Sequence, residues 1–300
     1  MATTFLNMQD EVLGFLGEST SDTRTRVKRF LNRAASDFHY RYPWHWRRAV
    51  GFVSTVAPYT TGTVTLTNGS TTVTGSGATF TTAMVGRKIA LTYGSPWYTI
   101  SAFVSTTEVT LDRAYVEDTT SGATYVIYQD LYALSSAADS LLAQEVVCHK
   151  AGGEVLGRLT RTEVENAWAF PSGAGVPSYF HLHGVNSSGY LQIRVGREVP
   201  STAFSIRYGY LSAYTEMSAD GDLCVVPERF RHIIIHGALR EAYKLYNDDS
   251  LASQHGAAFD QQIALAWMRQ QSEVPAVFEM RAFDEGPQAV FHRAIVDVHT

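Results

Sequence analysis

The sequence has few cysteines and no long apolar run, and each absence excludes a class of protein. Its two cysteines, Cys148 and Cys224, lack the spacing of a disulfide framework or a zinc site, which indicates a reducing compartment. No stretch approaches the roughly 18 consecutive apolar residues of a transmembrane helix. Phe5 and Leu6 are followed by amide and acidic residues, so the N-terminus does not resemble a secretory signal. We therefore expect a protein made in the cytosol, with no membrane partner.

A strong excess of either charge is also absent. The net charge of −5 excludes a protein that coats nucleic acid, because that role requires a large basic surface. The 300 residues are 45% hydrophobic and 18% charged, which is typical of a soluble globular protein with enough core for one or two domains. A local cluster of basic residues in such a chain indicates a patch directed at one acidic partner.

The pattern of residues 22–42 predicts an amphipathic helix. Ser21 or Asp22 is a suitable N-cap, and Pro43 ends the helix because it disfavours helical geometry at the preceding residue. The apolar residues follow helical spacing: Val27, Phe30, Leu31, Ala34, Phe38 and Tyr42. The other face is basic: Arg24, Arg26, Lys28, Arg29, Arg33 and Arg41, continued by Arg47 and Arg48. Within the helix only Asp22 and Asp37 oppose this charge.

Partner helices for the apolar face are predicted near both ends of the chain. Residues 4–17 form a short amphipathic helix. Residues 227–246 and 250–271 form a pair of antiparallel helices, with Pro227 at the first helical position. Because the apolar stripes of these helices match, we expect one bundle. Trp44 and Trp46 are expected to anchor the bundle on the β-rich part of the chain.

Between these helices the pattern predicts β-structure. Residues 51–128 are rich in Thr, Ser, Gly and Val, and Asn68-Gly69 lies between two alternating segments, which is a strong hairpin signal. Six short strands with turn signals between them predict a small sandwich or barrel. Further strands are predicted within residues 129–212, and Thr160 with Glu163 has the pattern of a capping box.

The predicted fold class is α+β: a helical bundle formed by the N- and C-terminal helices, with an inserted all-β domain that is a small sandwich or barrel. We expect residues 1–50 and 130–276 to form the bundle core with a few strands. Residues 51–129 form the Thr/Gly-rich insert, and residues 277–300 form a C-terminal arm. The arm has too few apolar residues for a core of its own and too many for a solvated tail.

Candidate catalytic and metal-binding residues do not form a recognisable site in the sequence. His232 and His236 have zinc-ligand spacing on a helix, but the triplet between them lacks the glutamate of a metalloprotease. His181 and His183 share a strand face without a nearby Cys or carboxylate cluster. We interpret both pairs as core or interface residues. Because the sequence also lacks a P-loop and a Gly-x-Ser-x-Gly elbow, we expect neither enzymatic activity nor a catalytic, cofactor or metal site.

Two segments carry a resemblance to a known family. They read FLNRAASDFHYRYPWHW near the start and VPERFRHIIIHGALREAYKLYNDDSLASQHGAAFDQQIALAWMR near the end, with β-rich material between them. In this order the chain resembles the head-to-tail adaptor (connector, head-completion) proteins of tailed bacteriophages. The resemblance implies a virion structural protein at the head-tail interface. It also implies a ring, usually dodecameric, that docks beneath the portal protein and meets a tail or next connector protein. Packaged double-stranded DNA passes through its channel.

The resemblance gives the basic helix and the C-terminal arm their expected roles. The basic face is either a solvated surface or a surface that meets a neighbouring subunit, the portal or the DNA channel. The candidate interface residues are Arg24, Arg26, Arg29, Arg33, Phe278, Phe283, Phe291 and Ile295. An alternative function is a carbohydrate- or surface-binding β module of a phage structural protein, in which exposed Trp97 and Tyr98 stack on sugars.

Overall fold

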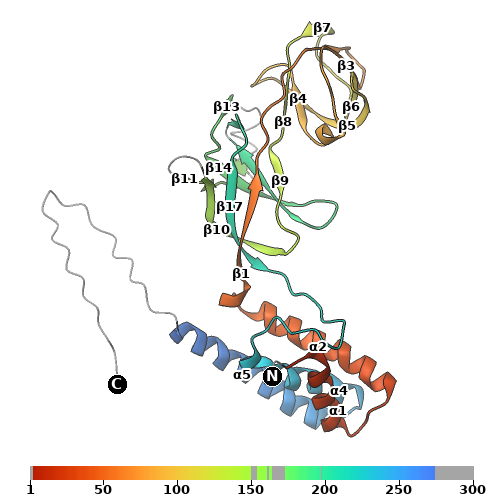
Figure 1. Cartoon of the computed structure of the whole chain (residues 1–300), viewed down its shortest axis with the longest axis vertical. Helices are drawn as coiled ribbons and strands as arrows, with labels where there is room; N and C mark the ends of the chain where they lie inside the picture. Colours follow the sequence, from red (N-terminus) through yellow and green to blue (C-terminus); the bar gives the residue numbers. More distant parts are fainter. Residues whose placement is uncertain (1–2, 150–153, 161, 164–172, 197, 274–300) are drawn as a thin grey trace, which may run out of the picture.

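The computed structural model describes residues 3–149, 154–160, 162–163, 173–196 and 198–273. The molecule is elongated, with three parts along its long axis (Figure 1). The helical body consists of α1, α2, α4 and α5, the middle β region of β1 and β9–β17, and the outer lobe of β2–β8. The predicted α+β class is confirmed, because helices from both ends of the chain form one body and the β-structure lies between them in sequence.

Two helices form the N-terminal half of the helical body: α1 (Phe5–Leu16) and α2 (Ser21–Arg41). The side chain of Thr4 caps α1, and Gly17 ends it in the left-handed region with a φ of 68°. The expected N-cap of α2 was wrong by one or two residues, because the Thr20 hydroxyl accepts the amide hydrogen of Thr23. Pro43 ends α2 as predicted, since Tyr42 is already extended.

The C-terminal half contains the short 3-10 helix η3 (Glu228–Phe230), α4 (Arg231–Leu245) and α5 (Asp249–Glu273). Pro227 is the residue before η3 and has extended geometry, so the expectation that it opens the helix was wrong. The carboxylate of Asp248 accepts the Leu251 amide at 3.0 Å and so caps the start of α5. The predicted helical pair is present.

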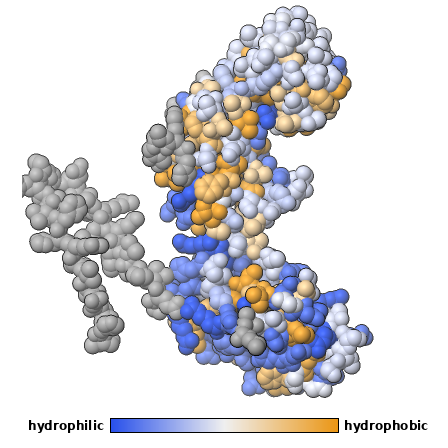
Figure 2. Space-filling model, in the orientation of Figure 1, coloured by the Kyte–Doolittle hydropathy of each residue, from blue (hydrophilic) through white to orange (hydrophobic). Residues whose placement is uncertain are grey.

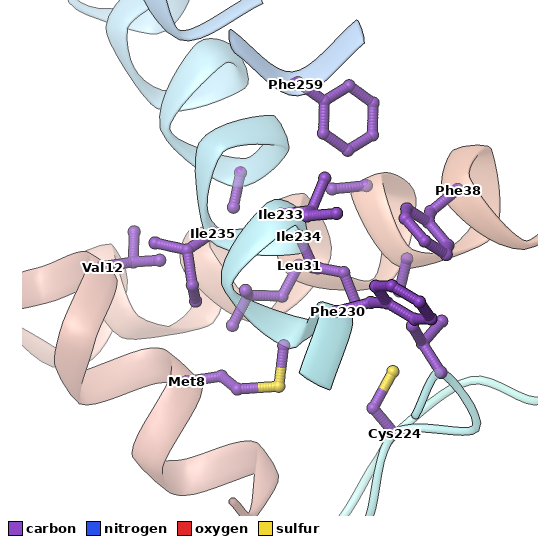
Figure 3. Close-up of a cluster of buried hydrophobic side chains, with 14 of the residues drawn as sticks. Met8, Val12, Leu31, Phe38, Cys224, Phe230, Ile233, Ile234, Ile235 and Phe259 are labelled. Atoms are coloured by element: carbon purple, nitrogen blue, oxygen red, sulfur yellow. The ribbon is translucent and has the colours of Figure 1, made fainter. Parts of the chain in front are cut away.

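The core of the helical body joins residues that are far apart in sequence. Figure 3 shows Leu31 and Phe38 of α2 facing the isoleucines of α4, with Met8 and Val12 of α1 on one side and Phe259 of α5 on another. Fully buried side chains include Phe5, Met8, Leu31, Phe38 and Phe259. Burial of such side chains contributes about 1.5–3 kcal/mol each. The predicted packing of distant apolar stripes is therefore confirmed.

The two tryptophans after α2 lie in the helical core. Trp44 is fully buried and stacks on Phe38, with ring centroids 4.8 Å apart, and on Trp46, at 4.6 Å. Trp267 of α5 meets the edge of Trp44 at 5.5 Å. The two tryptophans are core residues, as expected, but they do not close the helix onto the β part, because their ring partners belong to the helical body.

Arg47 joins the helical body to the middle β region instead. It ends the short 3-10 helix η1 (His45–Arg47) and is only 3% exposed. Its guanidinium donates to the His39 carbonyl at 3.1 Å and to the Ser212 carbonyl at 3.2 Å. It also forms an ion pair with Asp139 at 2.8 Å. A long side chain with several fixed donors can hold a helix end against a sheet.

The middle β region consists of two four-stranded sheets with a common core and a short strand pair. One sheet has the order β1-β17-β10-β11: Arg48–Ser54, Ser205–Ser212, Ala138–His149 and Glu154–Val155. The other has the order β12-β14-β15-β9: Gly157–Arg158, Tyr179–Val185, Leu191–Gly196 and Leu131–Ala133. The two-stranded pair is β13 and β16: Ala174–Gly175 and Val199–Pro200.

The outer lobe is a curled seven-stranded sheet around its own core (Figure 1). Its order is β7-β2-β3-β6-β5-β4-β8: Thr120–Ala123, Thr63–Leu66, Thr72–Ser76, Glu108–Leu111, Trp97–Ser105, Lys88–Ala90 and Val126–Tyr128, with the short 3-10 helix η2 (Thr82–Met84) between β3 and β4. The predicted β2–β3 hairpin is confirmed. Its turn is not the two-residue type, because Ser70 donates to the Thr67 carbonyl and only Gly69 has a positive φ.

The outer lobe is fastened to the middle β region by a buried charge cluster. Lys88 of β4 lies 2.5 Å from Asp130, and Arg194 of β15 lies 2.7 Å from the same carboxylate oxygen. Burial lowers the pKa of Lys88, while the adjacent Asp130 opposes that change. Breaking a buried ion pair of this kind leaves an uncompensated charge. The orientation of the lobe therefore has a specific anchor.

Two predictions fall at the edge of the described residues. The capping box at Thr160 is present, since the Thr160 hydroxyl accepts the Glu163 amide at 3.4 Å and the Thr160 amide donates to the Glu163 carboxylate at 2.7 Å. Residues 164–172, which follow this box, and the arm at residues 277–300 lie outside the described residues. In the part of the chain that the structure covers, no helix is both long and apolar enough to cross a membrane.

Candidate interface surfaces

The histidines with ligand-like spacing do not assemble a metal site in the described residues. No group of three or more His, Cys, Asp and Glu side chains there is suited to hold a metal ion. His236 instead contacts His255 of α5, with the two Nδ1 atoms 3.0 Å apart. Burial lowers the pKa of both imidazoles, and the charge of His255 lowers that of His236 further. The arrangement is a contact between helices rather than a reaction centre.

His181 has a structural environment as well. It is 8% exposed, and its Nδ1 lies 3.3 Å from the Leu159 carbonyl. The ring of His183 meets its edge, with centroids 6.4 Å apart. The pair therefore joins neighbouring strands.

The basic face of α2 is partly neutralised by acidic residues from other elements. Arg24 pairs with Asp10 of α1 at 2.8 Å, and Arg33 pairs with Glu241 of α4 at 3.1 Å. Lys28 reaches Asp220 at 2.8 Å, and its hydrogen bond holds the pKa of that carboxyl below the usual value. Asp22 and Asp37 are the acidic residues within the helix, and the fold adds Asp10, Asp220 and Glu241 from other elements. Tertiary folding supplies partners that sequence neighbours do not.

Arg26 and Arg29 differ from the other basic residues of α2. Both side chains are exposed, and neither has an ion-pair partner within the described ranges. Arg33 is 73% exposed even though it contacts Glu241. Because positions 26, 29 and 33 are three and four residues apart, these arginines form a stripe along one helix face. We call Arg26, Arg29 and Arg33 the arginine stripe.

A shallow groove borders the arginine stripe. It has a volume of about 480 Å³. Its walls are formed by Arg29, Asn32, Arg33, Ser36, Asp37 and Glu216. Figure 2 shows that the helical body carries much of the strongly hydrophilic surface in this view, whereas the surface of the outer lobe has intermediate hydropathy. The helical body is therefore the more suitable part for a charged contact.

A second groove lies where α5 passes the start of α4, and the sequence patterns did not predict it. It has a volume of about 310 Å³. Its floor contains the buried residues Phe230, Ile233 and Ala266, and its rim contains Arg229, His232, Gln262, Leu265 and Arg269. We call it the α4–α5 groove. The sequence feature that could have indicated this groove is Leu265, an apolar residue outside the packed stripe of α5. Leu265 is 44% exposed, and nearby Met268 is 61% exposed.

The outer lobe lacks the aromatic platform expected for sugar binding. Tyr98 is only 4% exposed and donates to Glu117 at 2.6 Å. Trp97 is half-buried, with Lys88 Nζ 3.9 Å from its ring centroid and the Arg113 guanidinium 5.5 Å from it. The expectation that both rings are exposed was wrong, because both contribute to packing or cation–π contacts.

The other candidate residues, Phe278, Phe283, Phe291 and Ile295, lie outside the described residues, so the structure places only the arginines of the predicted set. Those four arginines do lie on one helix, with Arg24 paired and the arginine stripe facing outward. A family model described as SU10 adaptor protein matches residues 3–281, and no curated protein matches the chain.

Proposed function

This chain belongs to the SU10 adaptor protein family, a family of phage structural adaptors, and on that premise we propose that it forms a ring between head and tail. The ring is dodecameric, lies beneath the portal protein and extends the channel for packaged double-stranded DNA. Its other face meets a tail or next connector protein. The protein therefore acts by binding other virion components and resides in the virion at the head-tail interface.

The observation that best supports this proposal beyond the family match is the arginine stripe. Three arginines line one exposed helix face in a chain with a net charge of −5, and two of them have no ion-pair partner among the described residues. Exposed charges of one sign direct association with an oppositely charged surface. The stripe, extended by Arg24, is proposed to meet an acidic surface on a neighbouring subunit or the portal, or the DNA in the channel.

The C-terminal arm, residues 277–300, is the second proposed contact. Its sequence combines Phe278, Phe283, Phe291 and Ile295 with Gly286-Pro287. A segment of this composition gains by burying its apolar residues on another protein, and it loses conformational entropy only when it binds. The arm is proposed to dock on an adjacent subunit and, through its distal residues, on the portal.

The outer lobe is proposed to be an insert that is separate from the adaptor core. Residues 1–50 and 130–276 are the proposed core and residues 51–129 the proposed insert, except that residues 51–54 of β1 pair with β17 and therefore belong to the middle β region. Its own hydrophobic cluster and its charged anchor at Lys88 support this division. The core then supplies the ring contacts, and the lobe projects from them.

Mass measurement of the purified chain, alone and with portal, tests the proposed function. We expect a large ring-shaped assembly by native mass spectrometry and negative-stain electron microscopy, either alone or on the portal. A chain that remains monomeric under both conditions would contradict the ring and favour an isolated binding module.

A further inference from the structure

The α4–α5 groove lies at a place where one helix extends beyond the other. Helix α5 has 25 residues and α4 has 15, so α5 runs about 15 Å past the start of α4. Figure 1 shows the C-terminal end of α5 extending beyond the other helices of the body. One side of this extension is covered, because Trp267 stacks on Tyr42 with centroids 4.9 Å apart. On another side of α5, Leu265 lines the groove and is exposed, and Met268 is exposed three residues further along the helix.

The chemistry of the groove selects a particular kind of occupant. Its floor is apolar, and Arg229, His232 and Arg269 stand at its rim. Gln262 also lines the groove. An apolar floor with a basic rim fits a peptide segment that carries a large apolar side chain and adjacent carboxylates.

One segment of this chain has that composition. Residues 278–285 read FEMRAFDE, so Phe278 and Phe283 are each followed directly by a carboxylate, and three carboxylates stand against one arginine. The charge of this segment is opposite to that of the groove rim. Phe283 is ten positions beyond Glu273, the last residue of α5, and an extended chain spans about 33 Å over that distance. The segment can therefore reach a neighbouring molecule.

We propose that the α4–α5 groove binds residues 278–285 of a neighbouring copy of this chain, an inference that rests on the proposed ring because the ring places copies side by side. Helix α5 passes its own groove and continues outward for another turn, so it carries the following residues away from that groove. Phe283 occupies the apolar floor, and Asp284 and Glu285 face the basic rim. The contact links each subunit to the next.

Disulfide trapping between full-length chains tests this inference. One preparation carries Met268→Cys and the other Phe283→Cys, and the native Cys148 and Cys224 are both buried, which limits background. After mixing and mild oxidation, the linked peptides are identified by mass spectrometry. We expect the 268–283 disulfide to form several-fold faster than with Phe15→Cys in place of Met268→Cys, because docking raises the local concentration of the two thiols. Phe15 is a matched control, since it is 59% exposed and Met268 is 61% exposed.

Charge reversal provides the second part of the experiment. Arg269→Glu in the Met268→Cys chain should lower the yield of the mixed disulfide, and Asp284→Lys with Glu285→Lys in the other chain should restore it. The mass of each mixture is measured in parallel. A large assembly whose disulfide yield equals that of the Phe15 control overturns the groove contact and leaves the ring intact. A third chain carries both Met268→Cys and Phe283→Cys, and if it forms only an intrachain disulfide, the contact between copies is also overturned. If the chains stay monomeric and form no mixed disulfide, both the groove contact and the ring are overturned.

Discussion

Arg47 of η1 and Asp139 of β10 form an ion pair of 2.8 Å across the junction between the helical body and the middle β region. Arg47 also bonds carbonyl groups from both sides of that junction, at His39 and at Ser212. One buried side chain thus satisfies acceptors from three separate segments. The relative position of helices and sheets depends on it.

Arg47→Met should lower the free energy of unfolding by about 2 kcal/mol, because the carbonyl and carboxylate acceptors lose their donor while the apolar stem is kept. Urea denaturation followed by circular dichroism measures this change. Arg48→Met is the matched control: Arg48 is exposed, and we expect a change within about 0.5 kcal/mol. Equal stability of the two variants would show that Arg47 does not secure the junction.

Gly237→Ala should destabilise the helical body by about 1–2 kcal/mol. A Cβ atom at Gly237 would lie 2.7 Å from the Ala34 Cβ and 2.8 Å from a ring carbon of Phe259. The resulting overpacking costs about 1–3 kcal/mol, which exceeds the gain of up to about 1 kcal/mol from better helix propensity.

Gly14→Ala is the matched control for this close approach. Gly14 also lies inside a helix, but its Cβ would meet no atom within 4 Å. We therefore expect Gly14→Ala to raise the free energy of unfolding by about 0.5–1 kcal/mol. Thermal melts of both variants give the comparison, and changes of the same sign would contradict the packing of α2, α4 and α5 at Gly237.

The His236–His255 contact should make stability depend on pH. Both imidazoles have a lowered pKa in the folded chain, so below about pH 6.5 the unfolded chain binds protons that the folded chain does not. The free energy of unfolding should therefore fall as the pH falls through this range. His232 adds positive charge near His236, and Tyr243 stacks on His255.

His255→Gln should reduce this dependence, measured as urea midpoints at about pH 7.5 and about pH 5.5. Part of the change in stability with pH will remain, because burial also lowers the pKa of His39. Exposed His45 offers the control, and His45→Gln should keep the full slope. An unchanged slope in the His255 variant would exclude the contact as its source.

Arg26→Glu with Arg29→Glu should prevent assembly while leaving the fold intact. Both residues are exposed, so the free energy of unfolding should change by no more than about 0.5 kcal/mol per site. Native mass spectrometry and electron microscopy report assembly, alone and with portal. Arg48→Glu with Arg158→Glu changes the net charge equally at exposed positions outside α2. A ring that forms normally from the α2 variant would remove the arginine stripe from the interface.

Replacing residues 60–125 by a short Gly-Ser linker should leave a folded core. Tyr59 and Ile127 are already adjacent, with the Tyr59 amide 2.8 Å from the Ile127 carbonyl, so a short linker can join their strands. The Asp130–Arg194 pair also survives the loss of Lys88. Replacing residues 51–128 should destabilise the core more strongly, because it removes most of β1 and therefore its pairing with β17. Circular dichroism and cooperative melting distinguish these outcomes; an insoluble first variant would mean that the lobe is integral to the core.

The sequence by itself determined the elements whose causes are local. Three features depend on residues close in the chain, and all were predicted: the apolar spacing within α2, the end of that helix before Pro43, and the Asn68-Gly69 turn. The matched apolar stripes of α2 and α4 also indicated one bundle, since each stripe needs a partner to exclude water. Boundaries were less accurate at Thr20 and Pro227, because neighbouring residues of similar type are nearly equivalent as caps.

Only the tertiary structure decided which charged and apolar residues remain available for binding. Arg24 and Arg26 look alike in sequence, yet folding brings Asp10 to the first and leaves the second exposed. Trp97 looked like an exposed ring until the fold placed Lys88 over it, and the α4–α5 groove exists only because α5 overhangs α4. Ion pairs, burial and grooves depend on distances between segments that are remote in the chain, and local sequence patterns do not contain those distances.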